Sequence, residues 1–144
     1  MSETKDSPIF PKSPLEEVGG IPYFVRMCDK IRLQMKGELH ADYQPNLGGG
    51  FDKWTCEYLR INYTDLVEKV QSGLDDGAAL EWAISVGGER TVPERDWWLS
   101  YMRNRGYGDD LSEVLTRRKQ ENGLDHRDDI VSFFGMIDAD EGRS

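Results

Sequence analysis

Arg32 is the residue whose position in the sequence most directly suggests chemistry. It closes the run RMCDKIR at residues 26–32, inside a stretch with helical periodicity. Successive residues of an α-helix are separated by about 100°, and on such a wheel one arc of roughly 120° holds six apolar residues: Ile21, Phe24, Val25, Cys28, Ile31 and Met35. Arg32 falls within that arc, so the pattern predicts that its guanidinium is buried.

A buried guanidinium stays charged and needs a partner that accepts its hydrogen bonds. Asp29, three residues earlier on the same helix, is the nearest candidate. The two residues form either a structural ion pair that fixes helix packing or one half of a site for an anion or substrate, and the sequence leaves both interpretations open. Arg26 and Lys30 point away from the apolar arc and are predicted to face solvent.

A second arginine, Arg105, repeats this arrangement. A helix is predicted from residue 92 to residue 105, and Arg105 lies in the middle of an arc formed by Trp97, Trp98, Tyr101 and Met102. An arginine over an aromatic ring gains roughly 0.5–2 kcal/mol from the ring quadrupole. Two interpretations remain open: Arg105 lies along the rings and caps the helix end, or it forms the base of an aromatic-walled pocket for a planar anionic ligand.

The candidate ligand-binding residues are therefore few. Tyr43 and Asn46 lie in a predicted loop at residues 38–50 and complete the set, which is Asp29, Arg32, Tyr43, Asn46, Trp98 and Arg105. No residue is assigned a catalytic role, because no nucleophile, base and orienting group can be argued from spacing.

Phosphate and metal chemistry receive little support. The run NLGGGFD at residues 46–52 places glycines before a predicted helix, but the spacing of a phosphate-binding loop is absent. Asp52 is predicted to cap that helix, which would put a carboxylate where a phosphate would bind. The two histidines, His40 and His126, lack ligand spacing, so neither a metal nor a cofactor is expected.

The composition limits the possible partners. Lys and Arg number 18 against 27 Asp and Glu, which gives a formal net charge of −9. This charge disfavours binding to nucleic acid or to an anionic membrane, because phosphates attract a basic surface. No apolar stretch is long enough to cross a membrane or to act as a leader, and the two cysteines are expected to be reduced. A cytoplasmic location is therefore predicted.

The elements that position these residues are predicted to be helical throughout. Start and stop signals delimit about six to eight short helices, and no stretch alternates with the period of a strand, so no sheet is expected. Capping boxes are predicted at Ser13–Glu16 and Thr91–Glu94. Further predicted N-caps are Asp52, Thr64, Asp109 and Asp125, and either Asp75 or Asp76 is predicted to start another helix. The predicted fold is an all-α compact bundle.

The expected organisation is a single domain. An extended N-terminal arm is predicted at residues 1–12, the helical domain at residues 13–138, and an acidic C-terminal tail at residues 139–144. A chain of 144 residues is long enough for one sizeable core.

Several motifs together resemble a family of small bacterial proteins catalogued only as a domain of unknown function. They are Arg-Met-x-Asp-Lys-x-Arg at residues 26–32, Tyr-x-x-Asn-Leu-Gly-x-Gly-x-Asp at residues 43–52, Glu-Trp at 81–82, Arg-Gly at 105–106 and Asp-Glu-Gly-Arg at 140–143. The resemblance implies a helical bacterial protein and no particular activity.

Three functions are consistent with these observations. A non-enzymatic binding module or adaptor with a protein partner fits the scarcity of acid–base groups and the small size. A binder of a small anionic ligand, or an enzyme, would use the Arg/Asp/aromatic residues as a pocket. A structural protein would form homo-oligomers through its aromatic helices. Whether the protein catalyses a reaction is left open.

Overall fold

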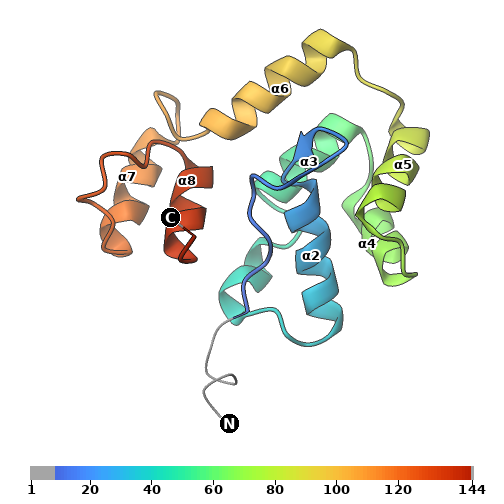
Figure 1. Ribbon diagram of the computed structural model, residues 1–144, viewed down its shortest axis with the longest axis horizontal. Helices are drawn as coiled ribbons and strands as arrows, with labels where there is room; N and C mark the ends of the chain where they lie inside the picture. The colour runs from blue at the N-terminus through green and yellow to red at the C-terminus, as the bar shows by residue number, and fades with distance from the viewer. Residues whose placement is uncertain (1–8, 144) are drawn as a thin grey trace. The chain divides into compact units, whose positions relative to one another are not determined.

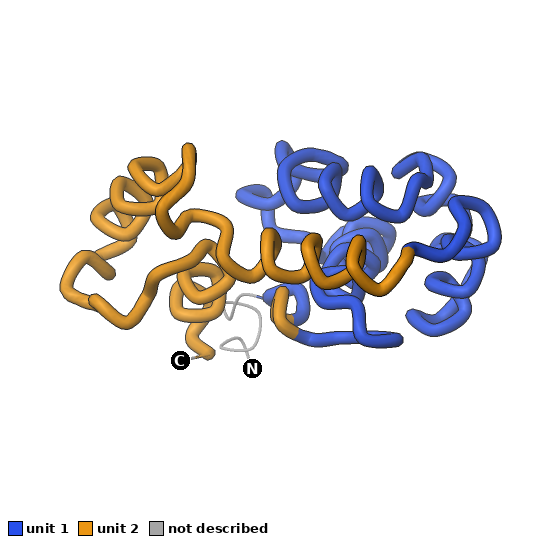
Figure 2. Tube along the Cα trace, turned by 90° about the horizontal axis from the view of Figure 1, so that it is seen from above, with its two compact units in different colours: residues 1–12, 16–90 blue, residues 13–15, 91–144 orange. Residues whose placement is uncertain are grey.

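The computed structural model describes residues 9–143, and these residues are mainly helical, as predicted. The chain divides into two compact units, shown in different colours in Figure 2. Unit 1 contains residues 1–12 and 16–90, and unit 2 contains residues 13–15 and 91–144. Each unit is described by itself below.

Unit 1 is organised around α2 (Phe24–Met35). This helix contacts α3 (Phe51–Leu59), α4 (Tyr63–Gln71), α5 (Asp76–Gly87) and the strand β1 (Glu17–Val18). The four helices are labelled in Figure 1. A 3-10 helix, η1 (Ala41–Asn46), lies between α2 and α3 in the chain. The core residues of α2 include Phe24, Val25, Met27, Cys28 and Ile31. Because α2 is enclosed by so many elements, most of its circumference is buried.

One glycine marks where two backbones of unit 1 come together. A Cβ built on Gly87, at the end of α5, would lie 1.8 Å from the carbonyl oxygen of Leu59. Any side chain at this position would displace backbone atoms, so the close approach of α5 to the end of α3 requires glycine.

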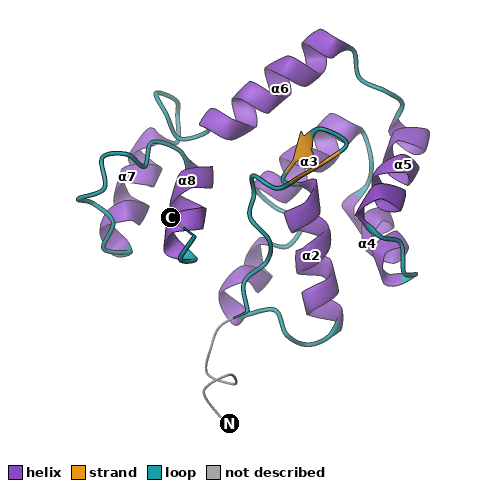
Figure 3. Cartoon of the chain, in the orientation of Figure 1, coloured by secondary structure: helices purple, strands orange, loops and turns teal. Residues whose placement is uncertain are grey.

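The expectation that the chain contains no strand is wrong at one short hairpin, coloured orange in Figure 3. β1 pairs antiparallel with β2 (Ile21–Pro22), with Val18 opposite Ile21. Gly19 and Gly20 form the turn with φ values of 58° and 77°. Positive φ at both central residues is what a tight two-residue hairpin turn requires, which explains why a Gly-Gly pair forms a hairpin here. The helix start predicted at Ser13–Glu16 is wrong for the same stretch, because Pro14 and Leu15 form a turn before the hairpin.

Unit 2 consists of α6 (Val92–Asn104), α7 (Ser112–Glu121) and α8 (Phe133–Asp140). α8 contacts both other helices. Phe134 and Met102 are almost fully buried, as is Leu115 on α7. Lys119 links the irregular segment before α8 to α7, because its Nζ donates to the carbonyl oxygens of Arg127 at 2.8 Å and Ile130 at 3.0 Å.

Two of the predicted helix starts are confirmed. The Thr91 side chain accepts a hydrogen bond from the Glu94 N–H, and the Glu94 carboxylate accepts one from the Thr91 N–H, so this capping box is complete. Asp75 caps α5 by accepting a hydrogen bond from Ala78 N–H at 2.8 Å.

The other four predicted caps are wrong. The residues at these N-cap positions are Gly50, Asn62, Leu111 and Ser132, in place of Asp52, Thr64, Asp109 and Asp125. Three of the predicted residues lie within two positions of the true cap. Polar residues are favourable at several positions around a helix start, so residue type alone does not identify the cap.

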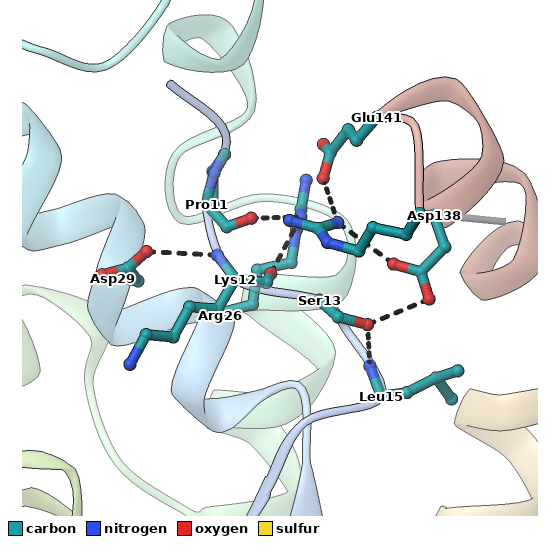
Figure 4. A network of polar contacts seen from close by, with 9 residues as sticks. Pro11, Lys12, Ser13, Leu15, Arg26, Asp29, Asp138 and Glu141 are labelled. Atoms are coloured by element: carbon teal, nitrogen blue, oxygen red, sulfur yellow. Dashed lines mark hydrogen bonds and ion pairs between the residues drawn. The ribbon is translucent and has the colours of Figure 1, made fainter. Parts of the chain in front are cut away.

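The predicted arm at residues 1–12 lies mostly outside the described residues, which begin at residue 9. At the other end, α8 continues through Asp140, so the predicted tail begins inside a helix. Glu141 is buried, and Arg143 pairs with both Asp138 and Glu141. In the same unit the Ser13 hydroxyl donates to Asp138 Oδ2 at 3.0 Å, as Figure 4 shows.

Candidate functional site

A closed polar cluster lies in the core of unit 1, formed by Tyr23, Lys30 and Asp52. Lys30 Nζ is 2.8 Å from Asp52 Oδ1, and the Tyr23 hydroxyl donates to the same oxygen at 2.8 Å. Lys30 Nζ also donates to the Tyr23 hydroxyl at 2.9 Å. All three residues are buried, and Asp52 is 0% exposed. We call this group the Asp52 cluster.

Local geometry brings the three side chains together. Tyr23 immediately precedes α2 and Lys30 follows it by about two turns, which places both on the same side of the helix. Asp52 is in the first turn of α3, where the helix dipole favours a carboxylate. Its second oxygen accepts a hydrogen bond from Gly48 N–H at 3.0 Å. The glycine run at residues 48–50 is therefore folded around an internal carboxylate, in the position where a phosphate would bind.

Tyr23 adopts a strained backbone conformation at its position in the cluster. Its φ is 72°, in the left-handed region that bulky residues rarely adopt, at a cost of roughly 1–3 kcal/mol. The side chain holds this conformation through its hydroxyl and through its ring, which lies 5.5 Å from the Phe51 ring. Burial, together with the negative charge of Asp52, raises the pKa of the Tyr23 phenol well above its usual value. The phenol is consequently a neutral hydrogen-bond donor at neutral pH.

Arg26 and Asp29 on α2 hold the chain segment that precedes the hairpin, as Figure 4 shows. Arg26 Nη1 donates to the carbonyl oxygens of Lys12 at 3.0 Å and Pro11 at 3.5 Å. Asp29 accepts a hydrogen bond from Lys12 N–H at 3.1 Å. Both side chains thus bind backbone groups of residues 11–12.

The predicted orientation of α2 is wrong for its cations. Arg26 and Lys30 were expected in solvent, but they are 3% and 5% exposed. Arg32 does not pair with Asp29: it lies 2.8 Å from Asp76 Oδ1 on α5, and the two side chains are 26% and 23% exposed. A helical wheel assumes one buried face, whereas α2 is surrounded by other elements on most sides.

Tyr43 and Asn46 belong to η1. The Arg26 guanidinium lies 5.7 Å from the centre of the Tyr43 ring, within the range of a cation–π interaction. The Asn46 carbonyl oxygen accepts a hydrogen bond from Gly49 N–H at 2.9 Å and closes the glycine turn. Unit 1 therefore places Tyr43 beside Arg26, and Asp29 beside Lys12.

Arg105 in unit 2 has its own carboxylates. Its Nη1 lies 2.7 Å from Asp110 Oδ1 and 2.9 Å from Asp109 Oδ2, and its guanidinium carbon lies 5.0 Å from the centre of the Tyr101 ring. The hydrogen bond to Asp110 raises the pKa of Arg105 and lowers that of Asp110. Although desolvation opposes it, hydrogen bonds from Gly106 and Leu111 N–H lower the pKa of Asp109. We call Arg105, Asp109 and Asp110 the Arg105 cluster.

The aromatic arc predicted on α6 is divided between two faces. Trp98 is 9% exposed and Met102 is fully buried, whereas Trp97 is 72% exposed and Tyr101 is 45% exposed. Exposed residues extend around most of the helix. We call the part formed by six of them the outward face of α6: Val92, Asp96, Trp97, Ser100, Tyr101 and Arg103.

A family model described as Domain of unknown function (DUF5069) matches residues 9–143, which is almost the whole chain. The chain belongs to the DUF5069 family. The prediction that the chain belongs to a domain family of unknown function is therefore confirmed. No curated protein matches this DUF5069 chain.

Sequence reasoning missed the residues that the DUF5069 fold brings together most tightly, Tyr23, Lys30 and Asp52. No local pattern pointed to them, because Lys30 lies on the side of the predicted helix away from its apolar arc and Asp52 is more than twenty residues away. Sequence reasoning also missed that Trp97, next to the buried Trp98, is exposed. Adjacent residues on a helix differ by about 100°, so on a helix with one narrow buried face the two members of such a pair differ in exposure.

Two further findings concern residues 9–143 of this DUF5069 chain. No three His, Cys, Asp or Glu side chains in this range are grouped closely enough to hold a metal ion. None of the helices found there combines the length and apolar composition needed to span a membrane.

Proposed function

We propose that this DUF5069 protein is a non-enzymatic binding module that recognises a protein partner through the outward face of α6. The supporting observation is the 72% exposure of Trp97, next to Tyr101 at 45% exposure. Large apolar side chains that adjoin on the surface of a folded protein are typical of an interaction site. Trp, Tyr and Arg are also the residue types that contribute most to binding at protein interfaces, and all three occur on this face.

The alternative proposal, a pocket for a small anionic ligand, has less support. Its two arginines already have carboxylate partners, Arg32 with Asp76 and Arg105 with Asp109 and Asp110. An anion would have to displace these carboxylates, which weakens its attraction to either site. In the Asp52 cluster, both carboxylate oxygens of Asp52 already have partners, which are Lys30 and Tyr23 at Oδ1 and Gly48 N–H at Oδ2.

The setting that we propose is the bacterial cytoplasm. Cys28 and Cys56 are both buried and unbonded, which suits a reducing compartment. The bacterial origin rests on the motif resemblance. The net charge of −9 supports a partner other than nucleic acid. Fractionation of bacterial cells that express the protein should recover it with a cytoplasmic marker, and recovery with the membrane fraction would contradict this assignment.

The binding role can be tested by photo-cross-linking in bacterial cells. A photoreactive phenylalanine analogue replaces Trp97 in one variant and Thr116, an exposed residue on α7, in a matched control. Irradiation should produce a discrete adduct of higher mass at position 97 and not at position 116, and mass spectrometry then identifies the protein attached. The proposal fails if position 97 gives no adduct, or if both positions give the same set of adducts.

A further inference from the structure

The outward face of α6 has two edges with different chemistry. Asp96 and Arg103 are seven residues apart, so they lie within about 20° of each other around the helix. Trp97 and Tyr101 are four residues apart and lie about 40° from each other on the opposite edge. Ser100 lies between the two edges. All five residues are exposed.

The outward face of α6 is complementary to the same face of a second copy when the two helices run antiparallel. A two-fold axis perpendicular to an antiparallel helix pair places each edge opposite the same edge of the other helix, running the other way. Asp96 then faces Arg103 of the second copy, and Trp97 faces Tyr101 of the second copy. The charged pair is centred between residues 99 and 100, and the aromatic pair is centred at residue 99. These centres differ by about 0.75 Å along the helix at a rise of 1.5 Å per residue, so a single axis serves both pairs.

The charges favour association at this face more than elsewhere. The chain carries a net charge of −9, so two copies repel each other over most of their surface. The helix from Val92 to Asn104 contains two acidic and two basic residues (Glu94, Arg95, Asp96 and Arg103) and carries no net charge. The small side chain of Ser100 at the centre allows the two helices to approach closely.

We infer that the partner is a second copy of this chain, bound through antiparallel α6 helices with Asp96–Arg103 and Trp97–Tyr101 contacts on either side of a two-fold axis. The inference rests on the proposed function and names the partner of that surface. Each contact occurs twice in the dimer, so a change to either edge acts twice.

The test is a charge reversal followed by sedimentation-velocity ultracentrifugation of the full chain at a series of concentrations. The wild type should dimerise as its concentration rises. Asp96→Arg and Arg103→Asp each place like charges opposite one another, and each should raise the dimer Kd by at least about tenfold. The double variant Asp96→Arg/Arg103→Asp exchanges the charges within both pairs and should restore dimerisation.

Two matched variants complete the experiment. Asp128→Arg makes the same charge change as Asp96→Arg at an exposed position outside α6 and should leave the dimer intact. Trp97→Ala should weaken the dimer without a change in net charge. Circular dichroism of every variant checks that the helices are retained.

The outcomes separate this inference from the proposed function. A wild type that stays monomeric at every concentration, or a double variant that fails to recover, overturns the dimer. If the photo-cross-link at position 97 then joins a different protein, the binding module stands with another partner. If position 97 gives no adduct either, both proposals fall.

Discussion

The two units hold a buried cation in different ways. In unit 1, the side chains of Lys30 and Asp52 are 6% and 0% exposed, so both charges lie out of water. In unit 2, the Arg105 side chain is 8% exposed, but its partners Asp109 and Asp110 are 27% and 78% exposed. The Asp52 cluster is thus closed, with both charges shielded from water, whereas the Arg105 cluster is open, with its carboxylates in contact with solvent.

This difference determines what each cluster contributes to stability. A fully buried ion pair contributes little beyond apolar residues of the same size, but removal of one member leaves the other charge buried and unpaired. A carboxylate that remains hydrated can be removed at small cost, because water and a neighbouring carboxylate replace it. The Asp52 cluster should therefore respond strongly to a single substitution and the Arg105 cluster weakly.

The largest effect is expected for Asp52→Ala. This change strands the Lys30 ammonium and removes the acceptor for Tyr23 and Gly48 N–H, so it should lower the free energy of unfolding by roughly 3–5 kcal/mol. Urea denaturation followed by circular dichroism measures the loss. The double variant Lys30→Met/Asp52→Asn removes both charges and should recover much of it. A loss below about 1 kcal/mol for Asp52→Ala would show that the closed pair behaves like an exposed one.

Alkaline pH should destabilise unit 1 selectively, because both cysteines belong to it. Burial raises the pKa of the Cys28 and Cys56 thiols to about 12, whereas an unfolded chain has a cysteine pKa of about 8.5. The thiols' contribution is complete below the unfolded pKa and is lost as the pH rises toward the folded pKa. Between about pH 7.5 and pH 9.5 the two thiols together should cost about 3 kcal/mol.

The measurement is urea denaturation at both pH values, with Cys28→Ala/Cys56→Ala as the control. Alanine does not titrate, so this variant should lose distinctly less stability over the same interval. An equal loss in the two proteins would assign the alkaline effect to other groups.

An intermediate effect is expected for Asp109→Ala in the open cluster. Asp109 accepts hydrogen bonds from Gly106 N–H at 2.8 Å and Leu111 N–H at 2.9 Å in addition to Arg105, so its loss resembles removal of a capping residue, about 1–2 kcal/mol. Asp110→Ala should cost less, because the Asp110 side chain binds the guanidinium and its own backbone N–H and is 78% exposed. Thermal unfolding of both variants decides the order, and a larger loss for Asp110→Ala would mean that charge rather than backbone capping governs this cluster.

The smallest effect is expected at Arg32. Its pair with Asp76 is about one-quarter exposed on both sides, so Asp76→Ala and Arg32→Met should each change the free energy of unfolding by about 1 kcal/mol or less. The two changes should be strongly non-additive in a double-mutant cycle, whereas Asp29→Ala and Arg32→Met should be additive. Coupling between Asp29 and Arg32 would contradict the pairing described for α2.

Local sequence signals were sufficient to predict the helical fold class and several helix starts of this protein. The helical character, the helix α2 within the periodic stretch at residues 21–36, the Thr91–Glu94 capping box and a helix start at Asp75 were all predictable, because they depend on residues within one or two helical turns. Membership of a domain family of unknown function was also predicted, and the family model confirms it. The Gly19–Gly20 hairpin carried a recognisable turn signal that helical periodicity obscured.

Only the tertiary structure decided which charged residues of α2 are buried and which carboxylates they pair with. From the sequence, Arg32 was expected in the interior and Arg26 and Lys30 in water. In the structure Arg26 and Lys30 are buried and Arg32 is partly exposed, because other elements enclose α2 on most sides. The partners Asp52 and Asp76 are more than twenty residues away in the sequence, on α3 and α5. Burial and charge pairing depend on which elements surround a helix, and that information is absent from the periodicity of the helix itself.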